Sequence, residues 1–239
     1  GEVNVAQQAP RQLFKTMGAR VLESSMDQQF QEKGFFEYHI YDLQRRTTLK
    51  NNQKKQINLL EASHFNVEKE YLVYGNKTYF NRQYREQNTK QPVNVNIVFK
   101  NTKENKLGMP LPKGIVRLYK EDDESKLQFV GSDSIEHTPK DEEISLKVGE
   151  AFDITVKRKQ IDFKQLTTRL QESEWEVVLK NHKDEDVVVS VIEPTYGNWN
   201  IVNSSHAYKK VDAFTLRFDI PVPKDETVKL KYRIQVGLR

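Results

Sequence analysis

The chain lacks cysteine entirely, although it is 239 residues long. This absence excludes disulfides, zinc–thiolate sites, iron–sulfur clusters and a cysteine nucleophile. Glycine and proline are scarce, with 10 and 8 residues, and neither a phosphate-binding G-x-x-x-x-G-K-[ST] loop nor a G-x-S-x-G nucleophile elbow occurs. No apolar run approaches the ~18 residues of a membrane-spanning helix. We therefore predict no cofactor and no transmembrane segment.

A strong excess of one charge is also missing. The 38 basic and 34 acidic residues leave a net charge of +4, and charged residues make up 30% of the chain. The most basic spots, Lys157–Lys159 and Lys209–Lys210, alternate with carboxylates along the chain. A nucleic-acid-binding protein would concentrate its basic residues in one patch. We therefore place these residues on an outer face and expect no nucleic-acid partner.

What the sequence does contain is period-two alternation. The last segment, VKLKYRIQV from Val228, places apolar side chains on one face and Lys, Arg and Gln on the other. Similar segments recur with short polar turns, and no strong helical period follows residue 34. Parallel α/β sheets need crossover helices, so the pattern predicts an all-β protein built from antiparallel sandwiches.

We predict three parts in the chain. Residues 1–34 form a linker, partly helical or irregular, with helical spacing around Leu13–Leu22 that would dock on its surroundings. Residues 35–139 form one β-sandwich, starting with a strand at Phe35, and residues 140–239 form an immunoglobulin-like β-sandwich. The predicted core of the second sandwich comprises Phe152, Ile154, Val156, Trp175, Val177, Leu179, Leu216, Phe218, Leu230, Tyr232 and Ile234.

A change of parity interrupts the long strand that contains Ile154 and Val156. After Val156 the apolar members become Ile161 and Phe163. A parity change within one strand predicts a bulge or bend near Lys157–Gln160, with Ile161 and Phe163 then facing inward.

Candidate functional residues are few. Tyr196 and Trp199 flank Gly197 at a turn and could stack on a sugar; alternatively, Trp199 starts the next strand and packs inward. The five histidines show no helical metal-binding spacing, and the acidic clusters at 121–124, 141–143 and 184–186 are typical of solvated turns. We predict no catalytic, cofactor-binding or metal-binding residue, and candidate ligand contacts only at Tyr196 and Trp199.

Several stretches together resemble a known bacterial domain of unknown function, which forms the C-terminal half of mucoidy-inhibitor-like proteins. The matching stretches are FFEYHIYDL from Phe35, TTLKNNQKKQINLL from Thr47, PVNVNIVFKNT from Pro92, MPLPKGIVRLYKED from Met109, FVGSDSIEHTPKDE from Phe129, VGEAFDITVKRKQIDF from Val148, NHK from Asn181 and VIEPTYGNW from Val191. Their order and spacing cover roughly residues 35 to 239 and are more specific than any single stretch.

The resemblance implies a signal peptide, a periplasmic, cell-surface or secreted location, and a further N-terminal domain before this region. The chain begins at Gly1, and we expect the natural protein to extend beyond it. The family offers no established catalytic residues. We therefore expect a non-enzymatic structural or protein-interaction module of a cell-envelope protein, with a protein partner there. A glycan-binding module is the alternative, and a hydrolase whose turn carboxylates converge in space is the second alternative.

Overall fold

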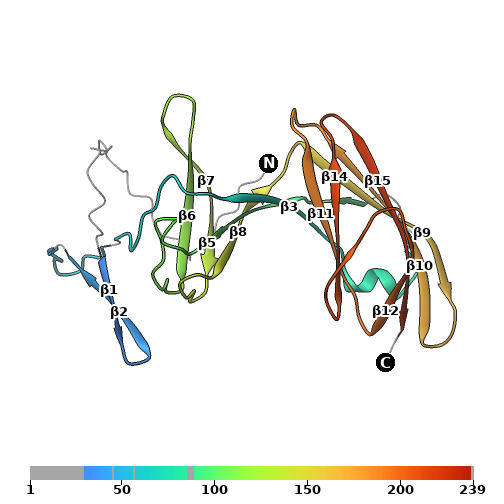
Figure 1. The fold of residues 1–239 in the computed structure, drawn as a ribbon, viewed down its shortest axis with the longest axis horizontal. Helices are drawn as coiled ribbons and strands as arrows, with labels where there is room; N and C mark the ends of the chain where they lie inside the picture. Colours follow the sequence, from blue (N-terminus) through green and yellow to red (C-terminus); the bar gives the residue numbers. More distant parts are fainter. Residues whose placement is uncertain (1–29, 45, 56, 85–88, 238–239) are drawn as a thin grey trace.

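A computed structural model of the chain describes residues 30–44, 46–55, 57–84 and 89–237. The described chain is all-β, apart from a short 3-10 helix, η1 (Lys77–Phe80). Figure 1 shows an elongated molecule with a hairpin at one end, a small β body next to it and a larger β-sandwich at the other end. The predicted helix around Leu13–Leu22 lies outside the described residues.

The larger sandwich packs two sheets face to face. The first sheet contains, in spatial order, β12 (Asn198–Ser204), β15 (Thr227–Gly237), β10 (Leu170–Asn181), β9 (Ile154–Gln165) and β4 (Thr89–Gln91). The second contains β13 (Lys209–Asp212), β14 (Thr215–Val222), β11 (Val187–Pro194), β3 (Glu68–Tyr74), β5 (Asn94–Lys100) and β8 (Glu143–Glu150). The strands β14, β11 and β3 of this second sheet cover the first sheet and enclose the main core.

The main core confirms most of the alternation that the sequence showed. Leu230, Tyr232 and Ile234 on β15 are buried, as are the predicted residues on β10 and β14. The prediction for Phe152 is wrong, since its side chain is 78% exposed. Phe152 precedes the start of β9, in a bend where strand parity no longer dictates the direction of the side chain.

The long strand β9 contains one bulge. Trp175 of β10 pairs with Gln160 and its neighbour Glu174 pairs with Asp162, so Ile161 is the extra residue. The bulge lies at the end of the predicted range, but the inward direction predicted for Ile161 is wrong, because this side chain is 44% exposed. A bulged residue has no partner in the ladder, which frees Ile161 from the inward row.

The six-stranded sheet joins the two bodies. Strand β3 pairs with β5 in an antiparallel manner through residues 68–72 and with β11 in a parallel manner through residues 71–74. This is the only parallel pair among the described strands, and the predicted antiparallel arrangement describes the others. Strands from both sides of residues 139/140 thus share one sheet, and the sheets do not divide there.

The small body has its own core around β5 and β8. A hairpin of β6 (Gly114–Glu121) and β7 (Leu127–Ile135) packs on it, and the buried residues are Phe99, Leu111, Ile144 and Leu146. Gly131 is required where β7 crosses β8, because a Cβ atom there would lie 2.6 Å from the carbonyl oxygen of Val148. The hairpin is therefore seated closely on the sheet.

The N-terminal described segment is a two-stranded hairpin, β1 (Phe30–Phe35) with β2 (Tyr38–Leu43). The prediction of one continuous strand from Phe35 is wrong, because Phe36 has φ 56° and lies in the turn. Residues 30–34, which we assigned to the linker, belong to β1. Tyr41 donates a hydrogen bond of 2.7 Å to the carbonyl oxygen of Pro110 and so connects the hairpin to the small body.

Candidate functional site

Tyr196, the first candidate ligand contact, is engaged by its own chain. It follows β11 in the turn before Gly197, whose φ of 58° favours glycine. Its hydroxyl oxygen lies 2.7 Å from Oε1 of Gln171 and 3.0 Å from the carbonyl oxygen of Phe80. Burial raises the pKa of the Tyr196 phenol above its ordinary value. The polar end of this residue is therefore directed at the protein.

Trp199, the second candidate, lies in β12 opposite Val236. Its indole N–H donates to the carbonyl oxygen of Ala213 at 2.9 Å, and its ring packs edge-on against Tyr208 at 6.3 Å. The ammonium of Lys210 lies 5.3 Å from the ring centre. Tyr196 and Trp199 are both half-buried and pack against the main core. Their arrangement is that of packed aromatic residues, with only part of each ring accessible.

An ion pair inside the main core is the main feature that sequence reasoning missed. Arg158 of β9 and Glu193 of β11 are 2% and 0% exposed, and Nη1 of Arg158 donates to Oε1 of Glu193 at 2.5 Å. Nε of Arg158 donates to Oε1 of Gln91 on β4 at 2.9 Å, and Nη1 also reaches the hydroxyl of Tyr232 on β15 at 3.2 Å. The network connects four strands of the two sheets.

We assigned Lys157–Lys159 to an outer face, and for Arg158 this prediction is wrong. Its guanidinium lies 5.2 Å from the ring centre of Tyr79 and 5.9 Å from that of Trp175, so aromatic faces surround the cation. The signal was present in the sequence, because Arg158 has the same parity as Ile154 and Val156. Parity predicts an inward side chain at this position, whereas charge alone predicts an exposed one.

Burial and mutual attraction act in opposite directions on the pKa of each member of this pair. Burial raises the pKa of the Glu193 carboxyl, and attraction to Arg158 opposes that rise. Burial also works to lower the pKa of Arg158, but the negative charge of Glu193 raises it above its ordinary value. A Cβ atom on Gly75 would lie 1.9 Å from Oε2 of Glu193, so glycine provides the space for this carboxylate. The pair is built into the fold as a structural element.

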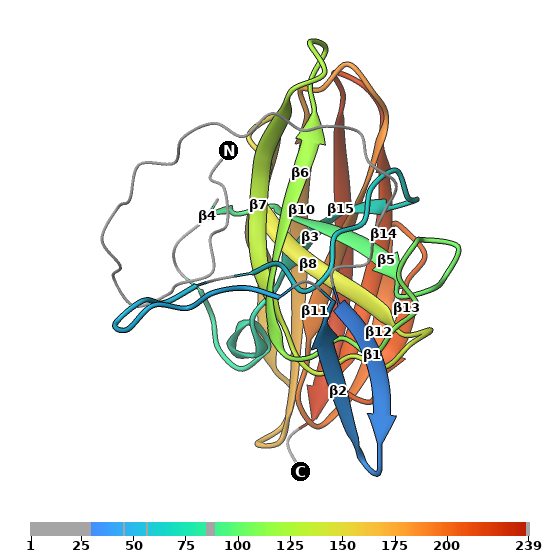
Figure 2. The same ribbon diagram turned by 90° about the vertical axis from the view of Figure 1, so that its left-hand side faces the viewer.

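Exposed apolar side chains gather on the β1–β2 hairpin. Phe36 at the turn is 91% exposed, Tyr38 is 70% exposed and Phe35 is 64% exposed. The adjoining segment 46–55 carries Arg46, Lys50, Lys54 and Lys55, all exposed, and no acidic residue. In Figure 2 the hairpin and this segment both lie at the end of the molecule that faces the viewer, where the segment extends sideways from the base of the hairpin.

The β6–β7 hairpin also exposes apolar residues, next to the opposite charge. Tyr119 and Phe129 pair across the hairpin with ring centres 5.6 Å apart, and Leu127 is 64% exposed. The turn between the strands contains Asp122, Asp123 and Glu124. The two hairpins thus present aromatic residues in different electrostatic surroundings.

Within the described residues, no group of three or more histidine or acidic side chains is placed to hold a metal ion. That same part of the chain contains no helix with the length and apolarity of a membrane span. In comparisons with known proteins, no family model, no curated protein and no solved structure matched the chain.

Proposed function

We propose that this chain is a non-catalytic structural and protein-interaction module of a bacterial cell-envelope protein. The observation that carries this proposal is the continuous six-stranded sheet, in which β3 belongs to both bodies. Hydrogen-bonded strands bend far less than a flexible linker, so the sheet would hold the small body at a fixed distance from the sandwich. Such an element suits a spacer that presents surfaces to other proteins.

The envelope location follows from the resemblance to mucoidy-inhibitor-like proteins. The same resemblance supports an immunoglobulin-like assignment for the C-terminal sandwich, a periplasmic, cell-surface or secreted location, and an N-terminal domain of the same chain as one neighbour. Because sandwiches of this type serve many functions, the fold alone says little about the activity. The surfaces of this chain therefore have to be tested directly.

The proposed protein-binding surface is the apolar face of the β6–β7 hairpin, formed by Tyr119, Leu127 and Phe129. Aromatic residues beside a polar margin are typical of protein interfaces. A protein partner of the envelope would bury these rings and face the acidic turn with basic groups. Its identity would have to come from recovery in the cell.

Photo-crosslinking in the intact bacterial envelope tests this proposal. A benzophenone amino acid at position 119 or 129 should yield a discrete crosslinked protein. The same probe at position 188 is the matched control, because Val188 is 52% exposed on the outer face of β11. Equal crosslinking at positions 119, 129 and 188, or none at any of them, would count against a specific protein partner.

The two alternative functions, glycan binding and hydrolysis, each require a different structural feature. Glycan binding needs the rings of Tyr196 and Trp199 to accept a sugar although the hydroxyl and the indole N–H already bond within the chain. Glycan-array binding that Trp199→Ala abolishes would establish it. A hydrolase needs two carboxylates about 5–10 Å apart across a cleft, and turnover of a glycoside substrate would establish that.

A further inference from the structure

The β1–β2 hairpin has two chemically different faces. Residues paired across an antiparallel ladder share a face, so Phe35 and Tyr38 lie together, with Lys33 and Ile40 two residues further along. The opposite face contains Tyr41, which bonds to Pro110 in the small body. The hairpin therefore turns its aromatic face away from the small body, and Phe36 continues that surface at the turn.

The side chains of this aromatic face are largely exposed, although so small an element would be stabilised by covering them. An isolated two-stranded hairpin is marginal in water, and its apolar side chains normally contribute by being covered. Here Phe35, Phe36, Tyr38 and Ile40 are between 43% and 91% exposed. Contiguous apolar surface of this kind marks an interaction site.

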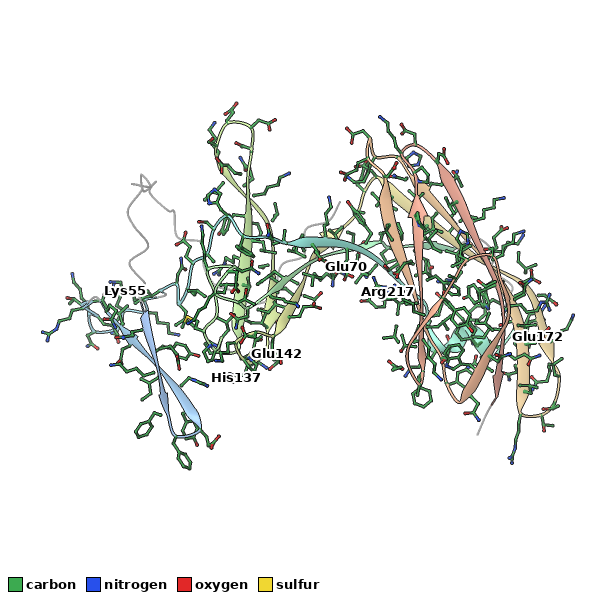
Figure 3. All side chains as sticks on the ribbon, in the orientation of Figure 1. Lys55, Glu70, His137, Glu142, Glu172 and Arg217 are labelled. Atoms are coloured by element: carbon green, nitrogen blue, oxygen red, sulfur yellow. The ribbon has the colours of Figure 1, made fainter. Side chains whose placement is uncertain are left out.

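The charge around the hairpin indicates which partner would cover it. The acids Asp42 and Glu32 are neutralised or hydrogen-bonded within the hairpin, by Lys33 at 3.1 Å and by His39 at 2.7 Å. The basic segment, residues 46–55, contributes four exposed cations, and none of them forms an ion pair with another described residue. Figure 3 places Lys55 at the base of the hairpin, at the same end of the molecule.

We propose that this end of the molecule binds the surface of an anionic lipid bilayer. Phenylalanine and tyrosine rings are favoured at the headgroup level, and lysine and arginine nearby are attracted to anionic lipids. One apolar insertion alone gives only weak membrane binding, and a basic patch supplies the second signal. The hairpin and the basic segment together provide both.

The charge next to the exposed rings favours a lipid surface as the partner of the β1–β2 end. The β6–β7 hairpin, for which we propose a protein partner, provides the comparison. Its rings lie beside Asp122, Asp123 and Glu124, which anionic lipids would repel. At the β1–β2 end the exposed rings instead adjoin a segment with four exposed cations and no acidic residue, residues 46–55. This inference goes beyond the proposed protein-interaction function and does not depend on it.

Flotation of the purified chain with lipid vesicles tests the proposal. We expect binding to phosphatidylcholine vesicles that contain about 30% phosphatidylglycerol, weaker binding to pure phosphatidylcholine, and release by salt. Phe35→Ser with Phe36→Ser should reduce the apparent affinity by about tenfold or more. Lys54→Gln with Lys55→Gln should reduce it by about tenfold on anionic vesicles only.

Two controls make the result specific. Tyr119→Ser with Phe129→Ser removes the aromatic pair of the other hairpin and should float like the unmodified chain. Glu37→Gln removes the acid next to Phe36 in the turn and should strengthen binding severalfold. Unchanged thermal unfolding of each variant shows that the fold is kept.

The proposal is overturned if the unmodified chain does not float with anionic vesicles, or if the Phe35→Ser/Phe36→Ser variant floats equally well. If benzophenone at position 36 instead recovers a discrete protein and no vesicle binding occurs, the hairpin is a protein-docking element and the lipid assignment is wrong. Because flotation uses no protein partner, its failure leaves the crosslinking test at positions 119 and 129 unaffected.

Discussion

The sandwich and the small body bury their apolar side chains to different extents. The sandwich encloses its core between two sheets, and complete rows such as Leu230, Tyr232 and Ile234 are buried. In the described part of the small body, the buried core cluster is formed by Phe99, Leu111, Ile144 and Leu146, and half-buried residues from strands and irregular segments complete it. Hydrophobic stabilisation scales with the apolar area removed from water, so the sandwich should be the more stable body.

The two cores also differ in how completely their buried polar groups are hydrogen-bonded. In the small body the buried amide of Asn101 donates to the carbonyl oxygens of Met109 and Pro139, both at 2.8 Å, and its oxygen accepts from the N–H of Gly108. In the sandwich, Nη2 of Arg158 and Oε2 of Glu193 have no hydrogen-bond partner among the described residues. The small body thus relies on a satisfied neutral amide, whereas the sandwich tolerates a costly ion pair because its apolar core is large.

The largest expected effect is that of Leu230→Lys in the sandwich. Leu230 is 0% exposed, so the substitution places an unpaired ammonium in the main core and should cost more than about 4 kcal/mol. Val188→Lys, at an exposed position of β11, is the matched control and should change stability by less than about 0.5 kcal/mol. Chemical denaturation measures both, and equal stability of the two variants would show that the register of β15 is wrong.

Glu193→Gln should produce the next largest loss. It leaves the Arg158 cation buried without its partner, for which we expect a cost of about 3–5 kcal/mol. The double variant Arg158→Met/Glu193→Leu removes both charges and should recover most of that stability, since buried ion pairs are often replaceable by apolar residues. A double variant as unstable as Glu193→Gln would mean that the pair contributes net stability to the sandwich.

Leu146→Ala tests the small body. Leu146 is 0% exposed, and its truncation should cost about 2–5 kcal/mol. We expect the loss in amide exchange of β5 and β8, with less change in β10 and β15, if the small body opens separately. Leu127→Ala at an exposed position of β7 is the control. Equal acceleration of exchange throughout both bodies would show that the shared sheet makes them one cooperative unit.

Alternation in the sequence predicted the sandwich core well because each strand there is half-buried and regular. It failed where local geometry breaks the ladder: Phe152 precedes its strand, Ile161 lies in a bulge, and Phe36 lies in a turn. The position of β3 in the same sheet as β11 was not predictable, because a parallel pairing between distant segments leaves no local pattern.

The candidate site shows the same limit. The turn aromatics Tyr196 and Trp199 were recognised by residue type, but their hydrogen bonds to Gln171 and Ala213 depend on tertiary contacts. Arg158 was misplaced although its parity was correct, since a lone charge is rarely buried unless a partner such as Glu193 faces it. The exposure of Phe35 and Phe36 depends on the hairpin turn, which contains Phe36 and separates Phe35 from Tyr38.

The smallest expected effect concerns the junction of the two bodies. On the outer face of the shared sheet, Arg217 of β14 contacts Glu70 of β3 at 3.2 Å and Asp219 at 2.5 Å. Figure 3 shows Glu70 and Arg217 where β3 passes from the small body into the sandwich. These charges join strands from both sides of the junction.

Asp219 makes this junction sensitive to acid. Partial burial works to raise its pKa, but hydrogen bonds from Lys209 and Arg217 outweigh that and lower it from 3.8 to about 2. Because the folded pKa lies below the unfolded one, the stabilisation is present above pH 3.8 and is lost as the pH falls toward 2. Asp219→Asn should therefore cost about 1 kcal/mol at neutral pH, after allowance for solvent screening, and almost nothing near pH 2. Denaturation of both proteins across this range, with Asp123→Asn in the β6–β7 turn as control, measures the difference, and a gap that stays constant with pH would show that the carboxylate of Asp219 does not hold the junction.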